Sequence, residues 1–286
     1  MVLMTFFVVI IINWQDSSGI DCIIDLWFGS SWSATITTFD NRQERHYTTM
    51  FLNDFFTESN NNILISEQQA SRFAKEICGD FNPIHNPDAK RFCVPGDLLF
   101  SLVLAKYGLS QHMAFTFAGM VGRGVKLRMP ETDADEFDIA DDTGKTYLHV
   151  TRSGERNSNE TLIEAFARSY VAFSGHNFPD LLVPLMAEHK VMVNTQRPLI
   201  IYESMSFDLG SLDLMDPALE LSSSSLDVNG KRGDAFLHFN ILSAGETAGT
   251  GIKTLVLSGL RDYEHDQIQQ LIEDIEGWKA DYYKRA

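Results

Sequence analysis

The chain has 286 residues, and its hydrophobic share of 44% and charged share of 22% are typical of a folded globular protein. A formal net charge of -16 argues against general binding to nucleic acids or to an anionic membrane surface, because both need clustered lysine and arginine. The odd count of three cysteines, without paired spacing, argues against a disulfide scaffold or a zinc site. We therefore expect a cytoplasmic protein in a reducing compartment.

The first 49 residues differ in composition from the rest of the chain. They contain three of the four tryptophans and none of the lysines. Their apolar run at 6–12 is too short to span a membrane, and no basic segment precedes it. We expect Met50 to be the true start of the protein and residues 1–49 to be an extension that is not native. The alternative is a pair of N-terminal strands that docks on the body.

A first helix is predicted over residues 67–78. Ser66 and Gln69 form a capping box at its start, apolar residues follow at helical spacing, and Gly79 is a suitable stop. The segment 80–85 then leaves the end of this helix as a loop that a proline stiffens.

A second helix is predicted over residues 97–107. Apolar side chains lie on every side of it, so the helix must be buried all round. Its length is far too short for a membrane span. The rest of the chain must therefore supply a layer that wraps this helix.

Four strands are predicted after the buried helix. They cover residues 113–129, 135–141, 145–153 and 161–174, although the last run also fits a helix. The sequence of residues 142–145 is typical of a hairpin turn between the second and third strands.

The same order of strands and turns recurs later in the chain. The matching segments are 115–127 with 199–209, 134–141 with 217–228, and 161–174 with 251–259. His149 matches His238 and Gly154 matches Gly245, so the repeat spacing is about 90 residues. The repeat favours a strand over a helix for residues 161–174. No further ligand stands close to either histidine, so we expect hydrogen-bonding strand histidines, no metal and no redox cofactor.

Together these elements predict an α+β fold in which an antiparallel sheet curls around one apolar helix. This is the hot-dog arrangement, and its recurrence predicts a double hot dog with one continuous sheet, which removes two exposed sheet edges. We expect a hot-dog domain over residues 50–180 and a second, degenerate repeat over residues 181–286. An apolar stripe from Ile268 to Trp278 predicts a C-terminal helix that covers a sheet face of the second repeat.

One short motif carries chemistry. Residues 79–85 read Gly-Asp-Phe-Asn-Pro-Ile-His, and together with the preceding helix they resemble the signature of the MaoC-like, or (R)-specific enoyl-CoA hydratase, family. This resemblance implies a hot-dog fold whose aspartate and histidine activate a water for addition to a 2-enoyl thioester. The chain from Met50 onward also resembles a bacterial family with no assigned function.

Hydration of a conjugated thioester needs a base for water, an acid for the α-carbon and donors for the thioester oxygen. Asp80 and His85 are close enough along the loop for both side chains to converge on one water, and we assign them as base and acid. Asn82 either orients that water or shapes the loop. The N–H of Gly96, at the start of the buried helix, is placed to bind an oxyanion.

The start of the buried helix departs from the family pattern. Pro95 replaces a polar residue, and Asp97 adds a negative charge near the oxyanion donor, which is unfavourable unless it points away or caps the helix. Two alternatives to a hydratase therefore remain open. One is a non-catalytic protein that binds or senses an acyl thioester. The other is a hot-dog thioesterase that uses Asp97.

Four cations are candidates for contacts with the phosphates of a CoA, namely Lys90, Arg91, Lys126 and Arg128. The expected partner is thus a small acyl thioester, carried either by CoA or by an acyl carrier protein. A monomer and a homodimer are both compatible with a double hot dog.

Overall fold

The computed structural model describes residues 10–15, 21–28, 32–39, 50–59, 62–175 and 178–285. Residues 1–46 form one compact unit, and in it β1 (Ile10–Gln15), β2 (Asp21–Phe28) and β3 (Trp32–Phe39) pair antiparallel in chain order. Residues 47–286 form the second unit. The boundary between repeats at residue 180, and the true start at Met50, stay predictions.

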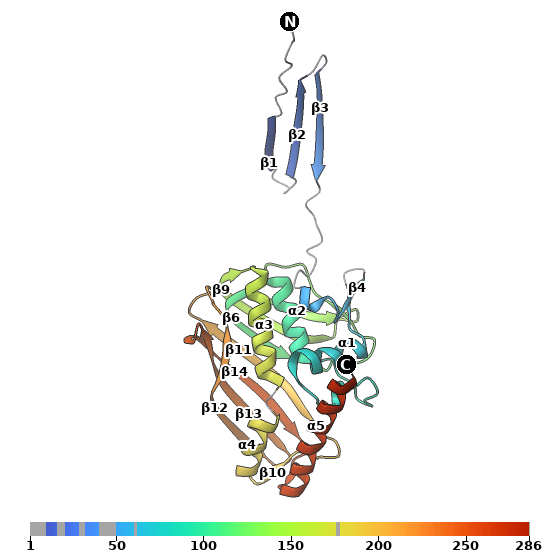
Figure 1. The fold of residues 1–286 in the computed structure, drawn as a ribbon, viewed down its shortest axis with the longest axis vertical. Helices are drawn as coiled ribbons and strands as arrows, with labels where there is room; N and C mark the ends of the chain where they lie inside the picture. The colour runs from blue at the N-terminus through green and yellow to red at the C-terminus, as the bar shows by residue number, and fades with distance from the viewer. Residues whose placement is uncertain are drawn as a thin grey trace. The chain divides into compact units, whose positions relative to one another are not determined.

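The second unit contains a continuous antiparallel sheet in the order β12-β13-β14-β11-β6-β9-β8-β7-β5-β4, within the part of the chain that the structure describes (Figure 1). The strands are β4 (Thr57–Ser59), β5 (Asn62–Leu64), β6 (Leu109–Phe117), β7 (Lys126–Arg128), β8 (Glu136–Asp141), β9 (Thr146–Asn157), β11 (Ile200–Leu209), β12 (Ala218–Asn229), β13 (Arg232–Ser243) and β14 (Glu246–Ser258). The predicted strand over 113–129 is therefore split into the end of β6 and the short β7. The two halves of the sheet join where β6 pairs with β11.

The predicted apolar helix is α2 (Gly96–Tyr107), and it is buried between the sheet and the other helices. The ring of Phe100 lies 5.1 Å from that of Phe115 on β6 and 4.5 Å from that of Tyr170. Because both the sheet and a helical layer cover α2, apolar residues are needed on all of its sides. The predicted α+β hot-dog architecture, a curled sheet around a buried helix, is confirmed.

Residues 161–174 are not a strand. They form α3 (Glu160–Gly175), whose buried positions Ile163, Phe166, Ala167, Tyr170, Val171 and Ser174 recur at helical spacing. The side chain of Asn159 caps the helix by accepting a 3.0 Å hydrogen bond from the N–H of Leu162. The apolar period of a helix was therefore the correct signal, and the repeat misled the assignment.

After its first pair of segments, the predicted repeat is displaced by one strand. Counted outward from the junction between β6 and β11, β14 is the strand equivalent to β9, and β13 is the strand equivalent to β8. His238 on β13 is therefore not equivalent to His149 on β9. Gly154 lies inside β9, whereas Gly245 lies in the turn between β13 and β14.

Two helices cover the second half of the sheet. The short α4 (Val183–Glu188) follows the π-helix η4 (Phe178–Leu182), and the C-terminal helix is α5 (His265–Arg285). Ile268 and Leu271 of α5 are buried in a hydrophobic cluster with Leu237 of β13 and Leu257 of β14, so the predicted covering helix is confirmed. A small separate sheet pairs β10 (Val191–Met192) with β15 (Arg261–Asp262). Among the described helices, none combines the length and the apolar character that a membrane crossing requires.

Candidate functional site

A cavity of about 320 Å³ lies where the two halves of the second unit meet. Its wall contains the motif loop, the start of α2, the end of α3, and parts of β11, β14 and α5. Most of the wall is apolar. The ionisable and hydroxyl side chains that concern the chemistry are Asp80, His85, Asp97, Ser174, Tyr202 and Lys253.

The motif loop is held by its own backbone and side chains. The first predicted helix consists of α1 (Glu67–Arg72) and the π-helix η2 (Phe73–Cys78), and it ends at Gly79, whose φ of 70° favours glycine. The N–H of Asn82 donates to the Asp80 carboxylate at 2.8 Å. The side-chain oxygen of Asn82 accepts a 3.1 Å bond from the N–H of Ile84, so this oxygen shapes the loop.

Asp80 and His85 converge, as the motif predicts. The Nδ1 atom of His85 lies 2.7 Å from the carbonyl oxygen of Cys93, so Nδ1–H donates to that carbonyl and the ring is fixed. The Nε2 atom then faces Asp80, with 3.5 Å between Nε2 and Oδ2. The neutral His85 ring therefore has one tautomer, and both Asp80 and His85 line the cavity.

The two groups stabilise each other's charged forms. Burial opposes charge on Asp80, but hydrogen bonding and charge from His85 outweigh it and lower the pKa of Asp80. Burial also opposes charge on His85, but Asp80 outweighs it and raises the pKa of His85. A carboxylate beside an imidazolium is the arrangement that a base and an acid need.

A second polar cluster, made of Asp97, Ser174 and Lys253, faces the same cavity. The hydroxyl of Ser174 donates to Oδ2 of Asp97 at 2.6 Å, and the Lys253 ammonium donates to the Ser174 oxygen. Burial raises the pKa of Asp97 and lowers the pKa of Lys253. Oδ1 of Asp97 is buried and has no hydrogen-bond partner within the described residues.

Asp97 therefore neither points away from the site nor caps the helix through its side chain. It lies on the first turn of α2 and is 8% exposed. The positive charge of Lys253 offsets part of the negative charge that an ionised Asp97 would place near the predicted oxyanion donor. Asp97, which departs from the MaoC-like pattern, is thus accompanied by a positively charged lysine from the second half of the sheet.

Sequence reasoning missed Ser174 and Lys253. Ser174 continues the buried stripe of α3, which was read as a strand. Lys253 lies two and four residues before Leu255 and Leu257 in a buried run of β14, and it stands opposite Met205. A lysine at an inward position of a buried strand was the signal that could have identified it.

Gly96 begins α2 beneath two aromatic rings. A Cβ atom there would lie 2.9 Å from Cδ1 of Tyr202 and 3.0 Å from Cε1 of Phe117. The first N–H groups of a helix have no partner inside it, so this end can receive an oxygen with negative charge. The oxyanion role of Gly96 stays a prediction.

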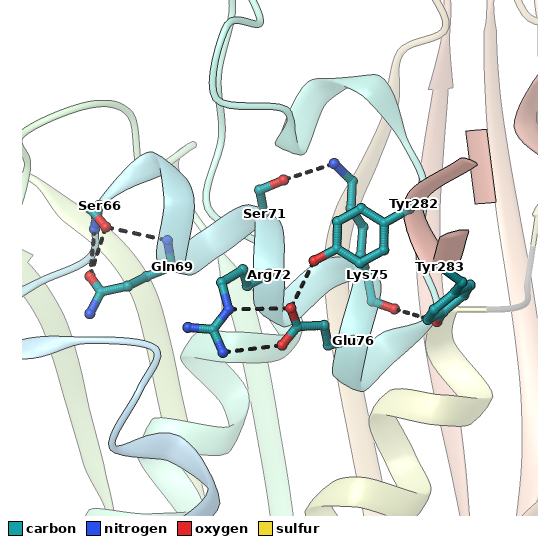
Figure 2. Close-up of polar contacts among 8 residues, drawn as sticks. All are labelled: Ser66, Gln69, Ser71, Arg72, Lys75, Glu76, Tyr282 and Tyr283. Carbon is teal, nitrogen blue, oxygen red and sulfur yellow. Dashed lines mark hydrogen bonds and ion pairs between the residues drawn. The ribbon is translucent and has the colours of Figure 1, made fainter. Parts of the chain in front are cut away.

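The C-terminal end of α5 fixes the helix that leads into the motif. Figure 2 shows the hydroxyl of Tyr282 donating to Glu76 at 2.7 Å and that of Tyr283 donating to the carbonyl of Lys75 at 3.1 Å. Arg72 holds Glu76 from the other side through a two-pronged contact. The ring of Phe81 also packs edge-on against both tyrosines. The last helix of the chain thus positions the motif.

The four predicted substrate-binding cations fall in two places. Lys90 and Arg91 line a groove next to the cavity, and this groove also touches Asn82 and Ile84. Lys126 and Arg128 are exposed on β7 and line neither hollow.

Neither strand histidine enters this site. On the surface, Nδ1 of His149 lies 2.7 Å from Asp138, and His238 is exposed. Among the described residues, no group of three or more histidine, cysteine or acidic side chains is placed to hold a metal ion.

The chain belongs to the family described as "Protein of unknown function (DUF3581)", whose model matches residues 50–266. This confirms the resemblance of the chain from Met50 onward to a family with no assigned function. No curated protein matches the chain.

Several solved structures are similar at low identity. The tesB protein of Mycobacterium avium subsp. paratuberculosis is 8% identical, with 71% of this chain and 95% of that chain covered and a TM-score of 0.39. The acyl-CoA thioesterase II TesB2 from Mycobacterium marinum is 10% identical, with 59% and 90% covered and a TM-score of 0.35. A conserved protein of unknown function with a hot dog fold from Alicyclobacillus acidocaldarius is 10% identical, with 73% and 98% covered and a TM-score of 0.40. The family description names no activity, so function has to be inferred from the site itself.

Proposed function

We propose that this protein is a hydratase or dehydratase that interconverts a 2-enoyl thioester and its 3-hydroxyacyl thioester. The observation that carries the proposal is the pairing of Asp80 with a tautomer-fixed His85 on the wall of an apolar cavity, beside the start of a buried helix. An acid, a base and an anion-binding helix end around one apolar space are the groups that this addition requires.

The reaction balances with these groups alone. Asp80 removes a proton from water, and the water oxygen bonds to the β-carbon. The electron pair of the double bond moves toward the thioester oxygen, which the N–H of Gly96 receives at the helix end. His85 then gives its Nε2 proton to the α-carbon, and the proton on Asp80 returns to His85 across the 3.5 Å contact. One water is added and the enzyme is restored.

The apolar part of the wall fits the acyl chain. Leu99, Phe117, Leu182 and Leu255 are among the residues that line it. A volume of about 320 Å³ is at the low end of the range for small-molecule sites, which favours short or medium chains. The apolar wall also excludes water that would compete with the positioned nucleophile.

A thioesterase is the second candidate, and one observation favours it. Oδ1 of Asp97 is buried, unpartnered and on the first turn of α2, where it can accept a proton from an attacking water. Replacing Asp97 with Asn separates the two candidates. Hydration should persist or rise because a buried negative charge is removed, whereas hydrolysis that depends on the Asp97 carboxylate should be lost.

The test is a hydration assay with crotonyl-CoA and a longer 2-enoyl-CoA, followed as loss of enoyl absorbance. The double variant Asp80→Asn/His85→Gln is the control, because both changes keep the size of the side chains. Turnover that disappears in the double variant supports the proposal. If the wild-type protein releases free CoA without hydrating the double bond, the proposal is wrong and the thioesterase candidate replaces it. Thermal stabilisation by these ligands without turnover would place the protein in the binding class.

A further inference from the structure

A large groove adjoins the cavity on the outside of the molecule. Its volume is about 1210 Å³, and it shares Asn82, Pro83 and Ile84 with the cavity. A ligand with its reactive end in the cavity can therefore continue along the motif loop into the groove.

Positive side chains gather in this groove from several parts of the chain. They are Lys90 and Arg91 after the motif, Arg197 before β11, Lys231 in the turn between β12 and β13, and Arg261 on β15. All of them are exposed, and none has a side-chain hydrogen bond or ion pair in the part of the chain that the structure describes.

The balance of charge in the groove opposes that of the whole chain. The groove has five cations against the three acidic residues Asp88, Asp262 and Asp274, a local balance of +2 in a chain of net charge -16. Cations that have no partner on the protein form strong, charge-assisted hydrogen bonds when a phosphate binds. Such a local excess in an acidic protein points to an anionic ligand at this place.

An aromatic ring completes the groove. Trp278 of α5 lines it and is 42% exposed, which is a large exposure for tryptophan. An exposed indole in the same groove as the cations offers a stacking surface for a nucleobase. A concave groove with such a ring fits a nucleotide better than the convex surface of a carrier protein.

We propose that this groove binds the phosphorylated adenosine end of coenzyme A, so that the thioester substrate is carried by CoA and not by an acyl carrier protein. The proposal rests on the proposed function in that the acyl thioester occupies the adjoining cavity. The pantetheine arm passes along Asn82, Pro83 and Ile84. The phosphates meet the groove cations, and the adenine ring stacks on Trp278.

The test is calorimetric titration with adenosine 3′,5′-bisphosphate and with CoA, because neither probe needs turnover. The variant is Arg197→Glu/Lys231→Glu. The matched control is Lys126→Glu/Arg128→Glu, which changes the net charge equally but lies on β7 outside the groove. We expect the groove variant to weaken both probes by about tenfold or more, because two phosphate contacts are lost and replaced by repulsion. The control variant should bind like the wild type.

Two further arms separate the sources of phosphate. Trp278→Ala should weaken the bisphosphate by about tenfold, because stacking is lost, and an enoyl-pantetheine fragment should bind more weakly than the matching enoyl-CoA. Equal binding by the groove variant and the wild type would overturn the proposal. So would equal binding of pantetheine and CoA thioesters, or a holo-acyl carrier protein that binds where CoA does not. If the bisphosphate binds but no enoyl-CoA is hydrated, the groove assignment stands and the hydratase proposal falls.

Discussion

Lys253→Met should destabilise the protein strongly at neutral pH. Lys253 is 3% exposed, its ammonium donates to Ser174, and it lies 4.1 Å from the ring centroid of Tyr202. Methionine keeps most of the aliphatic volume but removes the stronger of the two positive charges, those of Lys253 and His85, that act on the buried carboxylate of Asp97. Breaking a buried charge pair costs about 3–5 kcal/mol, and here the hydroxyl of Ser174 lies between the two charges. For a chain of this size such a loss lowers the melting temperature by about 6–20 °C.

The assay is urea unfolding followed by circular dichroism, for Lys253→Met, Asp97→Asn and the double variant. We expect the double variant to recover most of the lost free energy of unfolding, because the unpaired charge is then absent. Lys126→Met, at an exposed position of β7, is the matched control and should change stability by about 0.5 kcal/mol or less. A Lys253→Met protein as stable as the wild type, or single effects that simply add, would refute the coupling.

The pH dependence of this variant has a defined sign. The folded-state pKa of Asp97 is raised above its unfolded value, because burial disfavours the carboxylate. The folded state therefore binds the proton more tightly, and the contribution of this group to stability is present below the unfolded pKa and is lost as pH rises through the folded pKa. Without Lys253 this raised pKa should rise further. The defect of Lys253→Met should accordingly shrink on acidification.

The remaining predictions concern the motif and the helix start. The rate of hydration should fall on the acid side as Asp80 takes up a proton and on the alkaline side as His85 loses one, and His85→Gln should lower kcat by about 100-fold or more and remove the alkaline limb of a measured pH–rate profile. Gly96→Ala should cost about 1–3 kcal/mol in a thermal melt, because its Cβ would contact Tyr202 at 2.9 Å. Gly277→Ala, on α5 with open space around it, should instead stabilise by about 0.5–1 kcal/mol.

Local signals in the sequence predicted the motif half of the site. A capping box and a terminal glycine fix the helix before the loop, and the loop residues bond to one another within two positions, as Asn82 does with Asp80 and Ile84. The all-round apolar character of α2 likewise predicts burial without knowledge of its neighbours. Contacts between residues close in sequence follow from local sequence patterns, so the helix before the motif, the motif loop and the burial of α2 could be predicted.

The other half of the site depends on which strands pair over long separations in the chain, and no local signal in the sequence specifies that pairing. Lys253 reaches Ser174 across 79 positions of the chain, and only the pairing of β14 with β11 places it opposite Met205. The predicted repeat was displaced by one strand, so this contact could not be predicted from it. The same error turned α3 into a strand and so hid Ser174.

The two halves of the sheet contribute unequally to one site, and this explains why the second half can lack a motif of its own. The first half supplies the Asp80–His85 pair and the start of α2. The second half supplies Lys253, which compensates Asp97, and α5, whose Tyr282 holds the helix before the motif. A second copy of the motif would add carboxylate charge to a cavity that already contains two aspartates. A single motif, faced by a lysine from the other half, therefore places one Asp–His pair in the cavity without the carboxylate that a second copy would add.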